Sequence, residues 1–111
     1  MKIMDIVLYT TDTGKKPFAE WQTKLAPNTE AVILKRLARM RSGNFGDCKQ
    51  IKGVRGIYEL RIDYGPGYRI YYGKSGTTVV VLLVGGCKGS QSRDIAKATR
   101  YWLDFKEKKH G

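Results

Sequence analysis

The chain has 111 residues, with 21 Lys or Arg against 10 Asp or Glu, and a net charge of +11. This length favours one domain, residues 1–111, whose core needs neither a disulfide nor a metal. The charge favours a polyanionic partner, nucleic acid before an anionic membrane, because the one long apolar run, residues 79–84, is too short to span a bilayer. We expect no membrane binding.

The N-terminal residues, MKIMDIVLYTTD, do not resemble a secretory signal, because the fifth residue is acidic and no small-residue cleavage site follows an apolar stretch. A cytoplasmic location is therefore expected. Cys48 and Cys87 lie far apart without a CxxC pair, and the single histidine is His110. The sequence thus predicts reduced, packed cysteines, no metal site and no cofactor.

The first predicted elements are a strand over about residues 2–9 and a helix over about residues 16–25. Pro17 suits the first turn of that helix, and Pro27 is expected to end it. A second helix follows, with Asn28 as its N-cap and Gly43 as its C-terminal stop. Two helices joined by so short a turn are expected to form a hairpin on one face of the sheet.

The outer side of the second helix carries four cations. A solvated helix face explains such a cluster, because cations near a helix C-terminus are favourable, and RNA contact is the alternative. These residues are Lys35, Arg36, Arg39 and Arg41.

A β-hairpin is predicted around Gly65-Pro66-Gly67, which combines a fixed φ with residues that tolerate positive φ. A three-residue loop predicts a register in which the aromatic and aliphatic residues share one face. The opposed pairs are Tyr64 and Tyr68, Ile62 and Ile70, Leu60 and Tyr72, Asp63 and Arg69, and Arg61 and Tyr71. The other face is then charged, with Glu59 beside Arg61.

Two interpretations of this charged face remain open: a solvated surface held by cross-strand ion pairs, or a functional surface. The apolar run at residues 79–84 indicates a strand covered on both sides, so something must cover part of the charged face. One candidate is a final helix that starts near Ser90 or Ser92 and spaces Ile95, Ala98, Trp102 and Phe105 along one side. The other is a protein partner.

The sequence resembles the RelE/ParE superfamily of bacterial toxins, within it the HigB-like addiction module killer protein branch. The resemblance rests on GNFGDCKQIKGVRGIYELRIDYGPGYRIYYG, residues 43–73, and LLVGGCKGSQSRDIAKA, residues 82–98. It implies an α+β, RelE-like fold: an antiparallel sheet of about four strands with a mixed edge, an N-terminal helical hairpin on one face, and a C-terminal helix.

The resemblance also implies a function. The chain would be the toxin of a type II toxin–antitoxin system, a ribosome-dependent, metal-independent endoribonuclease that cleaves messenger RNA and arrests translation and growth. Its partners would be the ribosome, mRNA and a cognate antitoxin, usually a helix-turn-helix, HigA-like protein. The alternatives are a ParE-like inhibitor of DNA gyrase and a basic RNA-binding module without catalysis.

Cleavage through a ribose 2′-hydroxyl needs a base, cations for the phosphorane and an acid, and without a histidine pair these roles fall to lysines and arginines. By position, the resemblance implies that Arg69 holds the scissile phosphate, Lys88 stabilises the transition state and Lys52 transfers a proton. The expected RNA-binding residues are Lys49, Arg55, Arg61 and Tyr71, although Arg61 could equally be the structural partner of Glu59. Two positions depart from the family pattern: Ile95 replaces a tyrosine, and Cys87 replaces an acidic residue.

Overall fold

The computed structural model describes residues 3–110, with side chains through residue 108. Its strands are β1 (Asp5–Leu8), β2 (Cys48–Gln50), β3 (Ile57–Ile62), β4 (Tyr68–Ser75) and β5 (Val79–Cys87). Its helices are α1 (Pro17–Thr23), α2 (Pro27–Arg41), the 3₁₀ turn η1 (Lys88–Ser90) and α3 (Gln91–His110). Lys2, in the predicted first strand, and the side chain of His110 lie outside the described residues.

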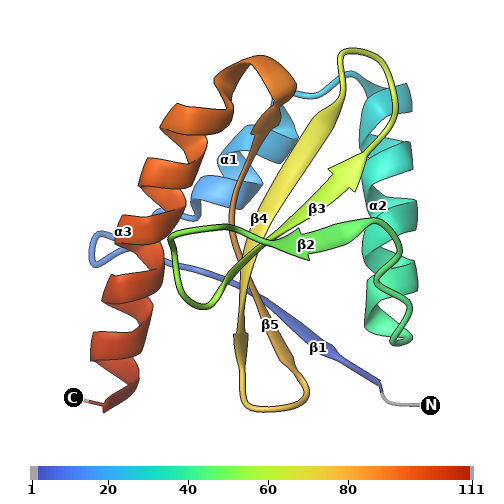
Figure 1. Ribbon diagram of the computed structural model, residues 1–111. Coiled ribbons are helices and arrows are strands. Elements are labelled where there is room, and N and C mark those ends of the chain that lie inside the picture. The colour runs from blue at the N-terminus through green and yellow to red at the C-terminus, as the bar shows by residue number, and fades with distance from the viewer. Residues whose placement is uncertain (1–2, 111) are drawn as a thin grey trace.

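The five strands form one mixed sheet in the order β1-β5-β4-β3-β2, as Figure 1 shows. Neighbouring strands are antiparallel except β1 and β5, which run parallel. The predicted α+β class and the mixed edge are confirmed, but the predicted number of about four strands is wrong. The strand that the sequence did not predict is β2, because three residues are too short to show a period-two pattern.

Helices α1 and α2 cover one face of the sheet, as predicted, but they diverge across it and do not pack along each other as the predicted hairpin would (Figure 1). Phe18 of α1 and Ile33 and Met40 of α2 are buried there against Leu60 and Ile70 of the sheet. One predicted outer cation, Arg36, also turns inward, and its Nη1 donates a hydrogen bond of 2.9 Å to the carbonyl of Arg61. Helix α2 therefore contacts β3 through a hydrogen bond as well as through apolar packing.

The N-cap of α2 lies two residues before the predicted one. Ala26 is the N-cap and Pro27 is the first helical residue, whereas Asn28 lies inside the helix. Proline fits this position because its fixed φ is helical and the missing N–H would have no partner there. Pro27 therefore starts the second helix, and Gly43, with φ 94°, follows its end as predicted.

Helix α3 covers the opposite face, and this confirms the predicted C-terminal helix (Figure 1). Ala98 and Trp102 are buried in a second core, and Ile95 and Phe105 pack against it. Trp102 lies directly over Gly73 of β4, where an added Cβ would stand 2.4 Å from the ring. No helix within residues 3–110 has both the length and the apolar character to cross a membrane.

Strand β5 is buried on both sides, as its apolar run predicts. Val80 and Leu82 face the helices α1 and α2, while Val81, Leu83 and Val84 face α3. Leu83 and Val84 follow each other in the chain but face the same side of the sheet, because the pairing with β4 shifts by one residue at a β-bulge. The strand therefore contributes to both cores.

The register of the predicted hairpin is wrong by two residues. Ile62 lies opposite Tyr68 and not Ile70, and Arg61 lies opposite Arg69 and not Tyr71. Because side chains alternate with a period of two, a shift of two keeps every paired side chain on its predicted face. The hydrophobic pattern alone therefore could not distinguish the two registers.

The shifted register lengthens the connection between β3 and β4 to residues 63–67. Asp63 is consequently outside the ladder and is not the cross-strand partner of Arg69. Tyr64, expected on the core face, is 38% exposed.

Candidate functional site

A hollow of about 520 Å³ lies where the β3–β4 connection meets η1, and we name it the turn hollow. It is lined by Asp47, Arg61, Asp63, the Gly65-Pro66-Gly67 turn, Arg69 and Lys88. Three of the predicted site cations, from β3, β4 and η1, therefore converge on one cavity.

The turn itself positions Lys88. The backbone N–H of Lys88 donates a hydrogen bond of 2.8 Å to the carbonyl of Gly67. Gly67 has φ 86°, a left-handed conformation that glycine adopts at no steric cost, and a Cβ there would lie 3.7 Å from Cβ of Lys88. This hydrogen bond joins the β3–β4 connection to Lys88, the first residue after β5, although the two are distant in sequence.

Arg69 is held from inside the fold. Its Nε lies 2.9 Å from Oε1 of Glu59, and the exposed fractions of the two side chains are 14% and 0%. The contact is an ion pair without hydrogen-bond geometry at Nε. Gln91, in the first turn of α3, donates a hydrogen bond of 2.7 Å to the same carboxylate oxygen. Helix α3 and the guanidinium therefore share one buried anion.

Arg61 is held at the surface by a different carboxylate. Its Nη2 lies 2.7 Å from Oδ1 of Asp47, and its Nε donates to the same oxygen at 3.1 Å. This hydrogen bond and the charge of Asp47 raise the pKa of the Arg61 guanidinium. The expected pairing of Arg61 with Glu59 is therefore wrong: Arg61 pairs with Asp47, and Glu59 pairs with Arg69.

Lys88 and Asp63 are the two charged groups of the turn hollow without an ion pair among the described residues. Both are exposed. A cation and a carboxylate are consequently available to a ligand in the same cavity as the guanidinium of Arg69. Neither Asp47 nor Asp63 was predicted as a site residue, and Asp63 was assigned to a cross-strand pair with Arg69 that the structure does not form.

Two predicted site residues lie in a different cavity. Lys52 and Arg55 line a hollow of about 420 Å³ formed by residues 50–55, and no residue lines both this hollow and the turn hollow. Lys49 lies on β2 opposite Glu59, on the side of the sheet that carries Arg69, but it lines neither cavity. The structure therefore does not bring Lys52 together with Arg69 and Lys88.

Tyr71 is not available for the RNA contact expected of it. Its side chain is fully buried under α3, and its hydroxyl has no hydrogen-bond partner among the described residues. Burial first, and then the charge of Glu59, raise the pKa of its phenol above the ordinary value. Its position on the charged face suggested exposure, but the helix that covers this face buries it.

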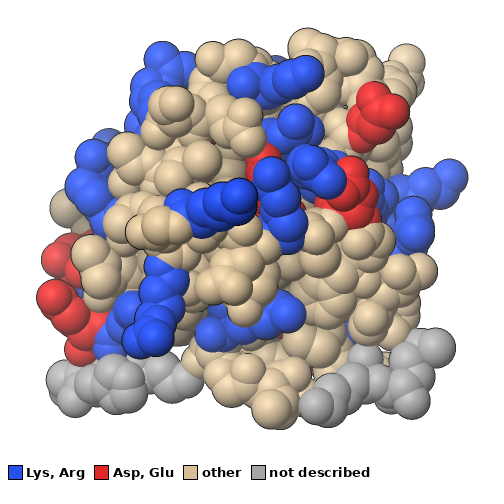
Figure 2. Space-filling model, in the orientation of Figure 1, with Lys and Arg blue, Asp and Glu red and all other residues tan. Residues whose placement is uncertain are grey.

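Positive charge extends beyond the turn hollow. Figure 2 shows Lys and Arg side chains gathered across the middle of the face that carries α3 and β2, with few Asp and Glu among them. Such a surface attracts phosphates by its field and by counterion release. Within the described residues, no three His, Cys, Asp or Glu side chains are grouped as metal ligands.

The position of Cys87 at the end of β5 affects its thiol. The backbone N–H of Gly89 and the hydroxyl of Ser90 both lower its pKa. Both cysteines are free, and Cys48 packs against the core beneath α1 and α2.

Comparison with known proteins shows a relative from Haemophilus influenzae. An uncharacterized protein of Haemophilus influenzae is 43% identical over 96 residues, which are 86% of this chain and 91% of the relative. No family model matches the chain.

Proposed function

We propose that this chain, which belongs to the same family as the Haemophilus influenzae protein, is the toxin of a type II toxin–antitoxin system and a ribosome-dependent endoribonuclease of RelE-like fold. The observation that carries the proposal is the turn hollow. Its cations Arg61, Arg69 and Lys88 surround a cavity that also holds carboxylates. A phosphodiester needs such cations, and its neighbouring 2′-hydroxyl needs a base.

In the proposed reaction, Arg69 and Lys88 bind the scissile phosphate and offset the charge that develops on it. Asp63 accepts the proton of the 2′-hydroxyl, whose oxygen forms a bond to phosphorus while the bond to the 5′-oxygen breaks. The ammonium of Lys88 donates the proton that the leaving oxygen requires. The products are a 2′,3′-cyclic phosphate and a 5′-hydroxyl. Asp63 replaces Lys52 as the base because Lys52 lies in the other hollow.

The small, open shape of the turn hollow supports a dependence on the ribosome. A shallow surface fixes a flexible RNA strand poorly, and much of the rate of a positioned reaction comes from holding the reacting groups in place. We expect the ribosome to supply that positioning, so that free RNA is cut slowly. A HigA-like, helix-turn-helix antitoxin would neutralise the basic face, and the proposed activity takes place in the cytoplasm.

Two variants test this proposal without disturbing a buried ion pair. Lys88→Ala and Asp63→Asn alter exposed groups, whereas Arg69→Ala would leave the buried Glu59 without its partner. Cleavage of mRNA on translating ribosomes, mapped by primer extension, should fall about 100-fold or more for each variant. Lys35→Ala, which removes an exposed cation on α2, is the matched control and should keep full activity.

Other results would favour the alternative functions. DNA breaks together with continued translation would indicate a gyrase inhibitor. Binding of RNA without any cleavage by the unaltered protein would indicate a non-catalytic module. Full cleavage by both variants would contradict the assigned site.

A further inference from the structure

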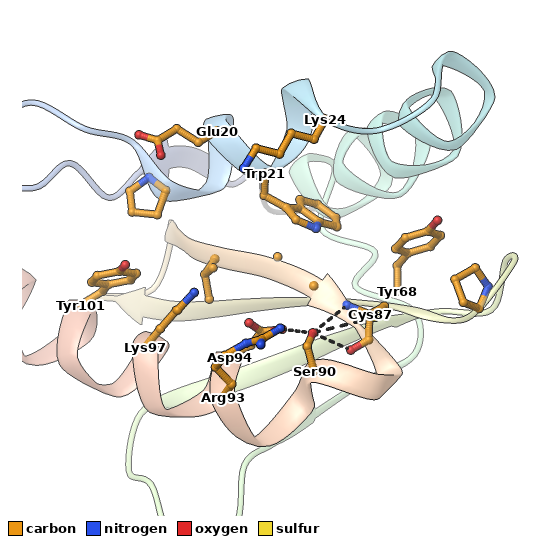
Figure 3. A pocket seen from close by; sticks show the side chains of 15 residues that line it. Glu20, Trp21, Lys24, Tyr68, Cys87, Ser90, Arg93, Asp94, Lys97 and Tyr101 are labelled. Carbon is orange, nitrogen blue, oxygen red and sulfur yellow. Dashed lines mark hydrogen bonds between the residues drawn. The ribbon is translucent and has the colours of Figure 1, made fainter.

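A second and larger cavity lies beside the turn hollow. It is a groove of about 560 Å³ between α1 and α3, floored by residues 84–87 of β5, and we name it the helix groove. Figure 3 shows side chains of α1 along one wall and of α3 along the other, with Lys97 extending from α3 into the space between them. Nothing in the proposed reaction uses this groove.

The helix groove continues the turn hollow. Pro66, at the tip of the β3–β4 connection, lines both cavities. Cys87 lines the groove, and the next residue, Lys88, lines the hollow. A chain molecule held at Arg69 and Lys88 would therefore pass over Pro66 and enter the groove.

The walls of the helix groove carry three cations without an ion-pair partner in the part of the chain that the structure describes. These cations are Lys24, the residue that follows α1, and Arg93 and Lys97 on α3. Of the two acidic residues of the groove, Asp94 is 4% exposed and accepts a hydrogen bond of 2.5 Å from Ser90. The three cations therefore remain available to an anionic ligand, with the exposed Glu20 as the one opposing group at the surface.

Aromatic rings accompany these cations. Trp21, Tyr68 and Tyr101 line the groove and are partly exposed. The rings of Trp21 and Tyr68 meet edge to face at 6.2 Å between centroids, so they form one aromatic surface at the end nearest Pro66. Cations that follow a phosphate backbone, together with rings on which bases stack, are the two components of single-strand recognition.

We propose that the helix groove binds the single-stranded RNA that flanks the phosphate held in the turn hollow. Arg93 and Lys97 contact phosphates, and Trp21 and Tyr68 stack with bases. This inference rests on the proposed function, because that function supplies the RNA in the turn hollow. It adds a subsite that extends the footprint of the protein along the strand.

Binding of a 2′-O-methyl RNA tests the subsite, because the methyl group removes the nucleophile and prevents cleavage. The probe is a fluorescent single strand of about 12 nucleotides, a length within the footprints of small single-strand-binding domains. Arg93→Ala/Lys97→Ala should weaken its binding about tenfold at low salt, since charge-assisted contacts are lost. The slope of log K against log salt should become less negative by about 1.4, which corresponds to two phosphates.

The matched control removes two cations with the same spacing from the opposite side of the sheet. Lys35→Ala/Arg39→Ala alters exposed residues of α2 that contact neither cavity. It lowers the net charge by the same amount, so its salt slope should equal that of the unaltered protein. Equal losses for the two double variants would overturn the subsite, because general charge would then explain the binding.

Base stacking distinguishes RNA from an acidic peptide as the ligand of the helix groove. An abasic strand of equal length should bind about tenfold more weakly for each stacked base that it lacks. The RNA, but not the abasic strand, should quench tryptophan fluorescence, since Trp21 lines the groove and Trp102 is 6% exposed. Polyglutamate that competes as well as RNA of equal charge would overturn the proposal in favour of a peptide site.

Two patterns distinguish a failure of this inference from a failure of the proposed function. If Lys88→Ala abolishes ribosomal cleavage while Arg93→Ala/Lys97→Ala binds RNA normally, the helix groove is not a subsite and the nuclease proposal stands. If the Arg93 and Lys97 variant loses RNA binding while Lys88→Ala still cleaves mRNA, the groove stands and the turn hollow is not the catalytic centre.

Discussion

Oε1 of Glu59 lies 2.9 Å from Nε of Arg69, and the carboxylate of Glu59 is fully buried. The two residues are diagonal neighbours on adjacent strands, since Glu59 lies opposite Tyr71 and Arg69 opposite Arg61. The arginine of the turn hollow is therefore fixed by an anion beneath the surface. The buried carboxylate of Glu59 thus orients the guanidinium of Arg69, which lines the turn hollow.

This ion pair predicts strong coupling between the two residues. Arg69→Met should lower the free energy of unfolding by about 3 kcal/mol, because the buried carboxylate of Glu59 loses its charged partner. In Glu59→Gln/Arg69→Met no charge remains, so about 1–3 kcal/mol of that loss should be recovered. Urea unfolding of both single variants and the double variant measures the coupling. Strictly additive losses would show that the pair contributes nothing as a unit.

The contact between Gly73 and Trp102 predicts a steric effect on the docking of α3. Gly73→Ala places a methyl group 2.4 Å from the Trp102 ring, and such overpacking should cost about 1–3 kcal/mol. Gly89→Ala is the control, because the nearest atom to its Cβ is Sγ of Cys87 at 3.9 Å. Thermal unfolding should separate the two variants clearly. Equal melting temperatures would contradict the close approach of α3 to β4.

The buried hydroxyl of Tyr71 predicts that its removal does not lower the stability of the protein. Tyr71→Phe removes a polar group that has no partner among the described residues, so stability should stay equal or rise by up to about 1 kcal/mol. Affinity for the 2′-O-methyl RNA should not change, because the ring is fully buried. A clear loss of RNA binding would mean that α3 moves away from this face when RNA binds.

The carboxylate of Asp104 predicts a dependence of stability on acid. It accepts a hydrogen bond from Tyr9 at 2.5 Å and lies 2.9 Å from the ammonium of Lys108. The bond from Tyr9, followed by Lys108, lowers the pKa of Asp104 below its ordinary value of 3.8. A lowered pKa contributes stability that is present above pH 3.8 and is lost as the pH falls through the folded-state value.

Asp104→Asn should therefore reduce the melting temperature at neutral pH and lose less stability than the parent protein when the pH falls below about 4. Melting curves recorded between neutral and acidic pH measure this. Glu107→Gln, an exposed change on the same helix, is the control and should keep the parent's acid dependence. An unchanged acid dependence in Asp104→Asn would show that the Tyr9 contact does not stabilise the charged form.

Most of the secondary structure could be predicted because it depends on local patterns. The 3.6-residue spacing of Ile95, Ala98 and Trp102 predicts α3, and the apolar run of β5 predicts its burial on both faces. The register of β3 and β4 could not be predicted in this way. Two registers that differ by two residues bury the same side chains, and the bond from Lys88 to Gly67 forms only when distant segments meet.

The candidate site was predictable in part. Arg61, Arg69 and Lys88 were all selected from the sequence, and all three line the turn hollow. Lys52 was selected on the same grounds, but the loop after β2 places it in another cavity. Alternation along a strand shows which face a residue occupies, and it does not show which part of that face another element covers.

The sequence by itself determined the two faces of the sheet, the helices and the positive charge, because each follows from the order and spacing of residue types along a short stretch. Only the tertiary structure decided that Glu59 pairs with Arg69, that α3 buries Tyr71, and that the turn hollow continues into the helix groove. The physical reason is that these relationships join segments far apart in the chain. Their geometry depends on loop lengths and packing, which no local pattern encodes.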